Sequence, residues 1–125
     1  MTSNRRRAPR HETLLHVALH VAAKRAPADG VRGVVSSLSR SGLFCATPAR
    51  AAVGQTVRFA FTSPDGVACE AVGFVIENRG ELGFAVEFQG ETREMKAFFD
   101  RVERLSADER WALLQSIDDG VIEIV

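Results

Sequence analysis

The sequence predicts a mainly β fold, an antiparallel barrel or sandwich followed by a helical segment. Residues 14–88 contain six short stretches in which apolar side chains stand at every second position, and turn-forming residues separate them. After residue 91 the apolar side chains recur every three or four positions, which is the spacing of an amphipathic helix. With 125 residues, 46% of them hydrophobic, the chain is long enough for one domain with its own core.

The first stretch, residues 14–22, fits two patterns. Apolar side chains at positions 15, 17, 19 and 21 have strand spacing, whereas those at 14, 15, 18, 19 and 22 form a helical stripe. We predict a strand, because the segments that follow are β. Pro27, Asp29 and Gly30 then favour a turn over 26–30.

Two further strands, near 31–36 and 43–47, flank a short polar segment. Its sequence is Ser37-Leu38-Ser39-Arg40-Ser41-Gly42, and we expect a tight turn over 37–42. A loop from Pro48 to Gly54 follows the second of these strands.

Three more strands complete the β region. Residues 56–61 alternate apolar with polar or small side chains, as in a half-buried strand. Ser63-Pro64-Asp65-Gly66 has proline and glycine at the positions that a type I turn favours. The next strand spans about 67–77, and after a turn over 78–80 the sixth strand runs from Leu82 to Phe88.

Two helices are expected after the strands. A helical stripe over 92–105 predicts the first, with the apolar residues Met95, Phe98, Phe99, Val102 and Leu105. Ser106 and Glu109 have the spacing of a capping box, which marks the start of the second helix. We expect that helix to present Trp111, Leu114 and Ile117 to the core and to stop near Gly120.

The last five residues, 121–125, form a β-prone tail. An apolar strand of this kind can pair with a sheet edge, either in its own chain or in a partner. The second helix and the tail are therefore a candidate surface for a homodimer or for an effector protein.

Charge is unevenly distributed along a chain whose net charge is zero. Residues 1–50 have a net charge of +7, whereas 51–90 and 91–125 have nets of −3 and −4. Zero net charge argues against a general nucleic-acid or membrane-surface binder, and no apolar stretch approaches the roughly 18 residues of a membrane span. Because no signal peptide is recognised, we expect a cytoplasmic protein.

Catalysis and metal binding find little support in the residue types. His16 and His20 have metal-ligand spacing on a helix, but on a strand they stand roughly 13 Å apart. Cys45 and Cys69 lie in apolar runs without CxxC spacing, so we expect buried, reduced thiols. With no nucleophile elbow either, we expect no enzyme activity, no metal and no cofactor.

The first candidate binding element is the arginine cluster Arg5-Arg6-Arg7-Ala8-Pro9-Arg10. Residues 1–10 lack hydrophobic periodicity, so we expect a flexible arm. A guanidinium group matches phosphate and the O6/N7 edge of guanine bidentately, and two of them four residues apart can clamp a compact anion. The alternative interpretation is a solvated basic tail.

The second candidate element is the polar segment 37–42. If the chain is still extended there, the hydroxyls of Ser37 and Ser39 share a face, while Gly42 permits close backbone approach. These hydroxyls can bond the edge of a base. Alternatively, they satisfy only the amides of their own turn.

Taken together, the two elements resemble the PilZ family, whose members are receptors for the bacterial second messenger cyclic di-GMP. The resemblance covers about residues 5–105. Arg6 and Arg10 fall on the family's RxxxR positions, and Arg7 gives its common RRxxR form. In the second motif, Asp/Asn-x-Ser-x-x-Gly, Ser39 and Gly42 agree, but Ser37 stands where the family has Asp or Asn.

This resemblance implies a six-stranded antiparallel β-barrel with the first helix over 11–105, preceded by the arm over 1–10 that carries the RxxxR motif. The C-terminal helix and β-prone tail over 106–125 lie beyond the usual PilZ core. It implies that Arg6 and Arg10 bind phosphate and guanine, that Ser37 and Ser39 face a guanine edge, and that Gly42 shapes the turn. Arg5, directly before the motif, is associated in the family with binding a stacked pair of nucleotides. Serine at 37 in place of Asp predicts roughly tenfold weaker binding, because a neutral hydroxyl is the weaker acceptor.

The implied function is a single-domain cyclic di-GMP receptor. Its arm changes order on binding and thereby signals to an effector protein that is not identified. The alternative is a degenerate PilZ domain that does not bind the nucleotide and acts as a protein-interaction adaptor, for example in control of motility or surface behaviour such as biofilm formation. DNA or RNA binding through the arm is the weakest of the hypotheses.

Overall fold

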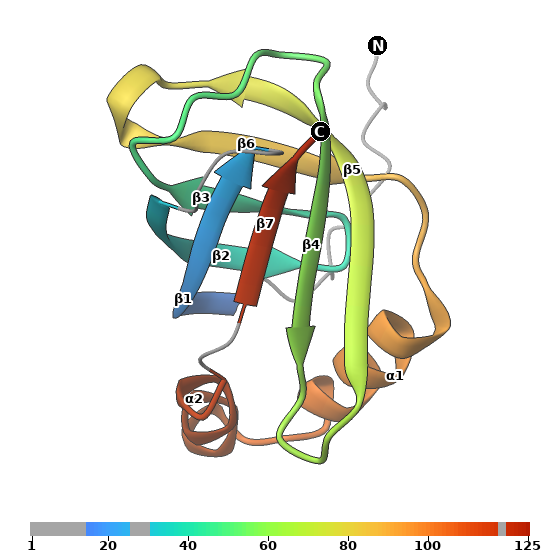
Figure 1. Ribbon diagram of the computed structural model, residues 1–125. Helices are drawn as coiled ribbons and strands as arrows, with labels where there is room; N and C mark the ends of the chain where they lie inside the picture. Colours follow the sequence, from blue (N-terminus) through green and yellow to red (C-terminus); the bar gives the residue numbers. More distant parts are fainter. Residues whose placement is uncertain (1–14, 26–30, 118–119) are drawn as a thin grey trace, which may run out of the picture.

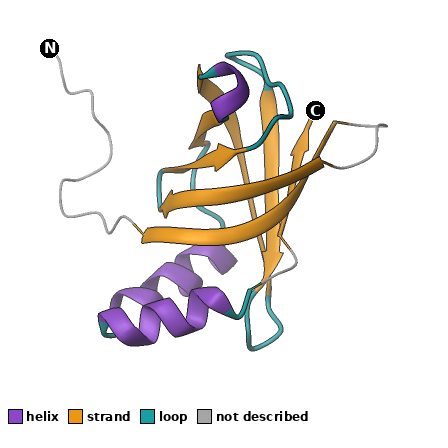
Figure 2. Cartoon of the chain, turned by 90° about the vertical axis from the view of Figure 1, so that its left-hand side faces the viewer, coloured by secondary structure: helices purple, strands orange, loops and turns teal. Residues whose placement is uncertain are grey.

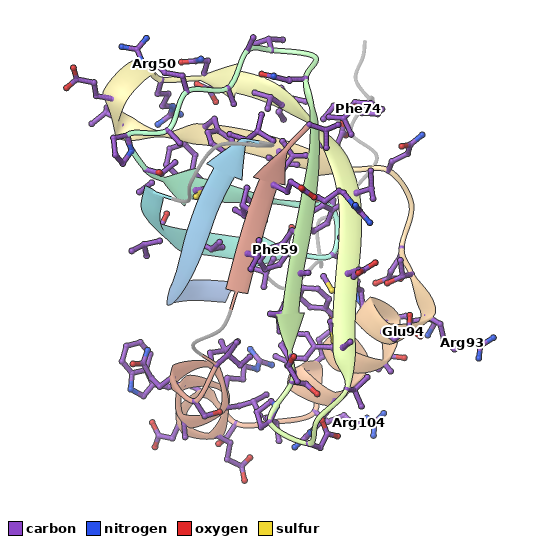
Figure 3. All side chains as sticks on the ribbon, viewed as in Figure 1. Arg50, Phe59, Phe74, Arg93, Glu94 and Arg104 are labelled. Atoms are coloured by element: carbon purple, nitrogen blue, oxygen red, sulfur yellow. The ribbon has the colours of Figure 1, made fainter. Side chains whose placement is uncertain are left out.

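Buried and exposed residues alternate along the strands, and this alternation builds a barrel around one core. The structure is a computed structural model that describes residues 15–25, 31–117 and 120–125. Along β5 (Ala68–Asn78), Cys69 and Val75 are buried, whereas Val72 and Phe74 face outwards. Phe59, from the neighbouring strand, lies inside the barrel behind the ribbon of that strand (Figure 3).

Seven strands close the barrel in the order β1-β2-β3-β6-β5-β4-β7 (Figure 1). All neighbouring pairs are antiparallel except β1 with β7. This confirms the predicted mainly β fold, and each of the six predicted strands is present. Besides β5, these are β1 (Leu15–Arg25), β2 (Val31–Ser39), β3 (Gly42–Ala46), β4 (Thr56–Thr62) and β6 (Phe84–Phe88).

The seventh strand, β7 (Gly120–Ile124), is the β-prone tail. It lies parallel to β1 on one side and antiparallel to β4 on the other, so the sheet edge that it pairs with belongs to its own chain. Ile122 and Ile124 are buried in the core. Because both of its edges are used inside the barrel, β7 offers no edge for pairing with a partner strand.

The two α-helices lie together at one end of the barrel, at the bottom of Figure 2. The first, α1 (Arg93–Glu103), begins where the Thr92 hydroxyl accepts a hydrogen bond from the Met95 N–H, at 3.2 Å. Its apolar face is buried against β5 and the core through Met95, Phe98, Phe99 and Val102, as predicted for these four. Leu105, the fifth residue predicted for this face, lies beyond the end of α1 and is only half-buried. Phe98 meets Phe61 edge to face at 5.0 Å between ring centroids, which anchors the helix to the aromatic core.

The second helix, α2 (Ala107–Gln115), starts at the predicted capping box. The Ser106 hydroxyl accepts from the Glu109 N–H, and the Glu109 carboxylate accepts from the Ser106 N–H. The helix ends at Gln115 rather than near Gly120, because the Ser116 N–H and hydroxyl turn back onto the Leu113 carbonyl.

The predicted burial is correct for Leu114, on α2, and for Ile117, which lies two residues beyond the end of α2, and it is wrong for Trp111. Leu114 and Ile117 are buried, but the Trp111 side chain is 57% exposed. The reason is the orientation of α2, which turns Leu114 towards the core and Arg110 towards the end of α1.

Two predicted boundaries also differ from the structure. The turn expected over 37–42 consists only of Arg40 and Ser41, because β2 continues through Ser39. Within β2, a register shift between Val35 and Ser37 allows both Val35 and Leu38 to point into the core. Strand β6 starts at Phe84, not Leu82, since Leu82 belongs to the short helix η1 (Gly80–Leu82) and is exposed.

Candidate ligand-binding site

The polar segment 37–42 forms the end of the β2–β3 hairpin. Ser39 and Gly42 are register partners, and Arg40 and Ser41 connect them. The Ser39 hydroxyl is buried and lies within the turn, 3.3 Å from the Ser41 amide, 3.2 Å from the Ser41 hydroxyl and 3.5 Å from the Gly42 carbonyl. These contacts correspond to the self-satisfying interpretation of Ser39.

Gly42 is required by packing between strands. A Cβ atom on Gly42 would lie 2.1 Å from the Val86 carbonyl oxygen of β6, closer than any real contact. Gly42 therefore allows β3 and β6 to approach. This close approach of backbones is the property expected from the sequence.

Ser37 lies two residues before Ser39 and is half-buried. Buried Leu38 separates the two serines, so in the extended strand Ser37 and Ser39 share the other face of β2, as predicted from their spacing. The register partner of Ser37 on β3 is Phe44, and paired residues present their side chains on the same face.

Phe44 is a residue of this face that the sequence interpretation missed. It is half-buried, and the Arg79 guanidinium lies 5.6 Å from the centre of its ring. An aromatic ring beside a serine is a surface on which a base can stack. Its only signal in the sequence is its alternation with Leu43 and Cys45, both of which are buried.

Arg40 is the second residue that was missed, although it lies within the motif. Its guanidinium donates from Nε and Nη2 to the two carboxylate oxygens of Glu103, both at 3.0 Å. It also donates to Glu91 at 2.7 Å and to Asp100 at 2.6 Å. The same guanidinium lies 5.6 Å from the centre of the Phe99 ring. The loop of the hairpin is thereby tied to helix α1.

These ion pairs shift the pKa values of Arg40, Glu103 and Asp100. The Glu103 carboxylate raises the pKa of Arg40 further above its ordinary value, and the Asp100 and Glu91 carboxylates add to this effect. In return, hydrogen bonds from Arg40 lower the pKa of Glu103. The pKa of Asp100 is lowered first by Lys96 and then by Arg40.

The two cysteines are buried and free, as predicted. Burial raises the pKa of the Cys45 thiol to about 12 and that of Cys69 to about 11, so neither is an activated nucleophile. Among the residues that the structure describes, no group of His, Cys, Asp and Glu side chains is arranged to hold a metal ion.

Two hollows in the surface lie away from the hairpin. One, between α1 and the turn at Ser63–Val67, holds about 70 Å³ and is lined by Asp65, Cys69 and Arg101 among others. The other holds about 180 Å³ and lies over β4, β5 and β7. Neither of these two hollows is lined by residues of 37–42.

The other predicted site residues, Arg5, Arg6, Arg7 and Arg10, lie outside the described part of the chain. The structure thus brings together Ser37, Ser39 and Gly42 at one hairpin and leaves the position of the arm relative to them as a prediction. None of the described helices is long and apolar enough to cross a membrane.

Barrel and hairpin together define a small β-barrel domain with a polar hairpin as its candidate binding surface. The PilZ domain model matches residues 4–105, and the chain belongs to the PilZ family, a family of cyclic di-GMP receptors. The match includes the arginine cluster and the hairpin and ends at Leu105, so α2 and β7 lie beyond it. Comparison with curated proteins and with solved structures gives no significant match.

Proposed function

We propose that this protein is a single-domain cyclic di-GMP receptor that binds the nucleotide between its arginine arm and the β2–β3 hairpin. The observation that carries the proposal is the family match over 4–105, which spans both motifs in their family order. It is supported by the hairpin, where Ser37 and Ser39 share the face of β2 that lies opposite the core residue Leu38.

In this proposal each motif residue has a chemical role. Arg6 and Arg10 bind phosphate and the guanine Hoogsteen edge through their two-pronged guanidinium groups, with Arg5 and Arg7 adding positive charge. Ser37 accepts a hydrogen bond from the other guanine edge. Ser39 and Gly42 keep the hairpin in the shape that presents Ser37.

The signal in this proposal is a change in the order of the arm. Ligand binding closes residues 5–10 over the hairpin and so creates or hides a surface that an effector protein reads in the cytoplasm. Such an effector could act in motility or surface behaviour. We place this contact, or a homodimer contact, at the helical end of the chain, where Trp111 is exposed.

Calorimetric titration of the full chain with cyclic di-GMP tests the proposal. Binding at micromolar concentration or tighter is expected, and Arg6→Ala or Arg10→Ala should remove it. Arg93→Ala, an exposed arginine that points away from the barrel at the start of α1 (Figure 3), is the matched control and should bind as the parent does. Unchanged affinity in the Arg6 and Arg10 variants would contradict the proposed site.

Ser37 provides a second, opposite test. Ser37→Asp supplies the charged acceptor that the family has at this position and should strengthen binding about tenfold. Ser36→Asp, on the neighbouring exposed position, should not strengthen it. Equal effects of the two substitutions would mean that Ser37 does not face the ligand.

The second candidate function is that of a protein-interaction adaptor, a degenerate PilZ domain that does not bind cyclic di-GMP. Two observations favour it: the serine at position 37 and the exposed Trp111 on α2, which lies beyond the family match. A flat cyclic di-GMP titration, together with a partner contact that is lost in Trp111→Ala but retained in Arg6→Ala, would favour the adaptor over the receptor.

A further inference from the structure

We infer that Arg40 is a positioning residue that couples the β2–β3 hairpin of the candidate site to helix α1. The inference rests on the proposed function for the identity of the ligand, cyclic di-GMP. It rests on the contacts of Arg40 for the coupling itself. Arg40 belongs to the two-residue loop between Ser39 and Gly42, and its side chain leaves the hairpin for α1.

The contacts of Arg40 explain why it positions the hairpin and does not bind phosphate. All three guanidinium nitrogens donate to carboxylates: Nε to Glu103, Nη1 to Glu91, and Nη2 to both Asp100 and Glu103. The cluster formed by Arg40, Lys96 and these three carboxylates has a net charge of −1. A phosphate that approached Arg40 would therefore be repelled by the acidic groups that already hold it.

Helix α1 is the element that receives the coupling. Asp100 and Glu103 lie on α1, and Glu91 immediately precedes its capping residue Thr92. The ring beneath the Arg40 guanidinium, Phe99, is completely buried in the core. A change in the hairpin loop therefore acts on a helix whose apolar face is closely packed in the core.

A second set of hydrogen bonds joins α1 to the second helix. Arg110 of α2 donates from Nε to the Val102 carbonyl at 3.0 Å and from Nη2 to the Glu103 carbonyl at 3.3 Å. Hairpin, α1 and α2 are thus joined in series by Arg40 and Arg110. Coupling between two binding sites is reciprocal, so a partner that binds at α1 or α2 would change ligand affinity at the hairpin by the same factor as the ligand changes the affinity for that partner.

A double-mutant cycle in cyclic di-GMP affinity tests the coupling. Arg40→Gln and Glu103→Gln should each weaken binding at least about fivefold, the lower end of typical coupling between sites. The double variant should bind no more weakly than Arg40→Gln alone, because both substitutions break the same link. Arg101→Gln is the matched control, since this α1 arginine pairs with Asp65 of the β4–β5 turn and not with the hairpin.

Unchanged affinity in Glu103→Gln, or losses that add in the double variant, would overturn the inference. A second measurement tests the coupling independently of the proposed function. In the ligand-free chain, Glu103→Gln should raise amide hydrogen exchange over 37–42, and Arg101→Gln should not. If the parent chain does not bind cyclic di-GMP, the receptor proposal fails but the coupling can still be tested by hydrogen exchange. Unaltered exchange over 37–42 in Glu103→Gln would reject the coupling.

Discussion

The Arg40 guanidinium and the Glu103 carboxylate, 63 residues apart in the sequence, meet through two parallel hydrogen bonds of 3.0 Å. A two-pronged pair of this kind fixes direction as well as distance, because both groups are planar. The loop of the β2–β3 hairpin therefore has a defined orientation relative to α1. Several measurable properties depend on this relationship.

Removing the guanidinium should lower stability moderately. The side chains of Arg40 and Glu103 are 24% and 32% exposed, so water screens their attraction in part. For Arg40→Met we expect a loss of about 1–2 kcal/mol in the free energy of unfolding, from several partly screened ion pairs and the contact with Phe99. Urea unfolding measures this loss.

Arg40→Lys provides the control for that measurement. It retains the charge but not the planar fork, so it should recover only part of the loss. Full recovery by lysine would show that charge alone, and not the two-pronged geometry, holds the hairpin to α1.

Acid should weaken the link between Arg40 and α1. Folding lowers the pKa of Glu103 and of Asp100, so the unfolded chain binds more protons than the folded one as the pH falls through this range. The stabilisation is complete above the ordinary carboxyl pKa of about 4 and is lost progressively below it. Unfolding free energies between neutral and acid pH should therefore fall less steeply in Arg40→Met than in the parent chain. Parallel pH profiles would contradict this assignment.

Gly42→Ala should destabilise the barrel through a clash. The added methyl group would meet the Val86 carbonyl at 2.1 Å, and a backbone atom of β6 cannot move aside as a flexible side chain can. We expect a cost of about 3 kcal/mol, the upper part of the range for overpacking. Thermal unfolding followed by circular dichroism measures it.

Gly54→Ala separates that clash from backbone strain. Gly54 has a φ of 91° but open space where a methyl group would lie, so only the left-handed conformation opposes alanine, at about 1–2 kcal/mol. A loss in Gly42→Ala no larger than in Gly54→Ala would mean that β3 and β6 can separate easily.

Both thiols should be unreactive while the protein is folded. Cys45 and Cys69 are buried, and burial raises their pKa values to about 12 and about 11. Almost no thiolate is then present at mildly alkaline pH, and both side chains are almost fully shielded from solvent. A colorimetric thiol reagent should titrate neither cysteine in buffer and both in denaturant. Rapid reaction of one cysteine in buffer would show that its strand opens locally.

Strands and helix starts were predictable because local patterns determine them. The alternation of residues over 56–61 predicts a strand with one buried face. Ser106 and Glu109 predict a capping box, because the two residues lie within a single helical turn. The hairpin serines were also placed correctly on one face, because strand geometry alternates strictly.

Features that depend on distant partners were not predictable in this way. The carboxylates that bind Arg40 lie 51 to 63 residues further along the chain, so no local sequence pattern predicts these ion pairs. Leu82 continues the alternation of β6 but lies outside it, because Gly83 has a φ of 128° and passes close to the Cys45 carbonyl. Trp111 has helical spacing with Leu114, yet the packing of α2 decides which of them is buried.

The position of β7 has a consequence for how this chain can be divided. The PilZ match stops at Leu105, but the sheet is completed by residues 120–124 inserted between β1 and β4. A fragment excised at the end of the match would leave two strands with bare hydrogen-bonding edges and an opened core, a template for aggregation. The smallest piece that can be studied in isolation therefore extends to the final strand, well past the family boundary.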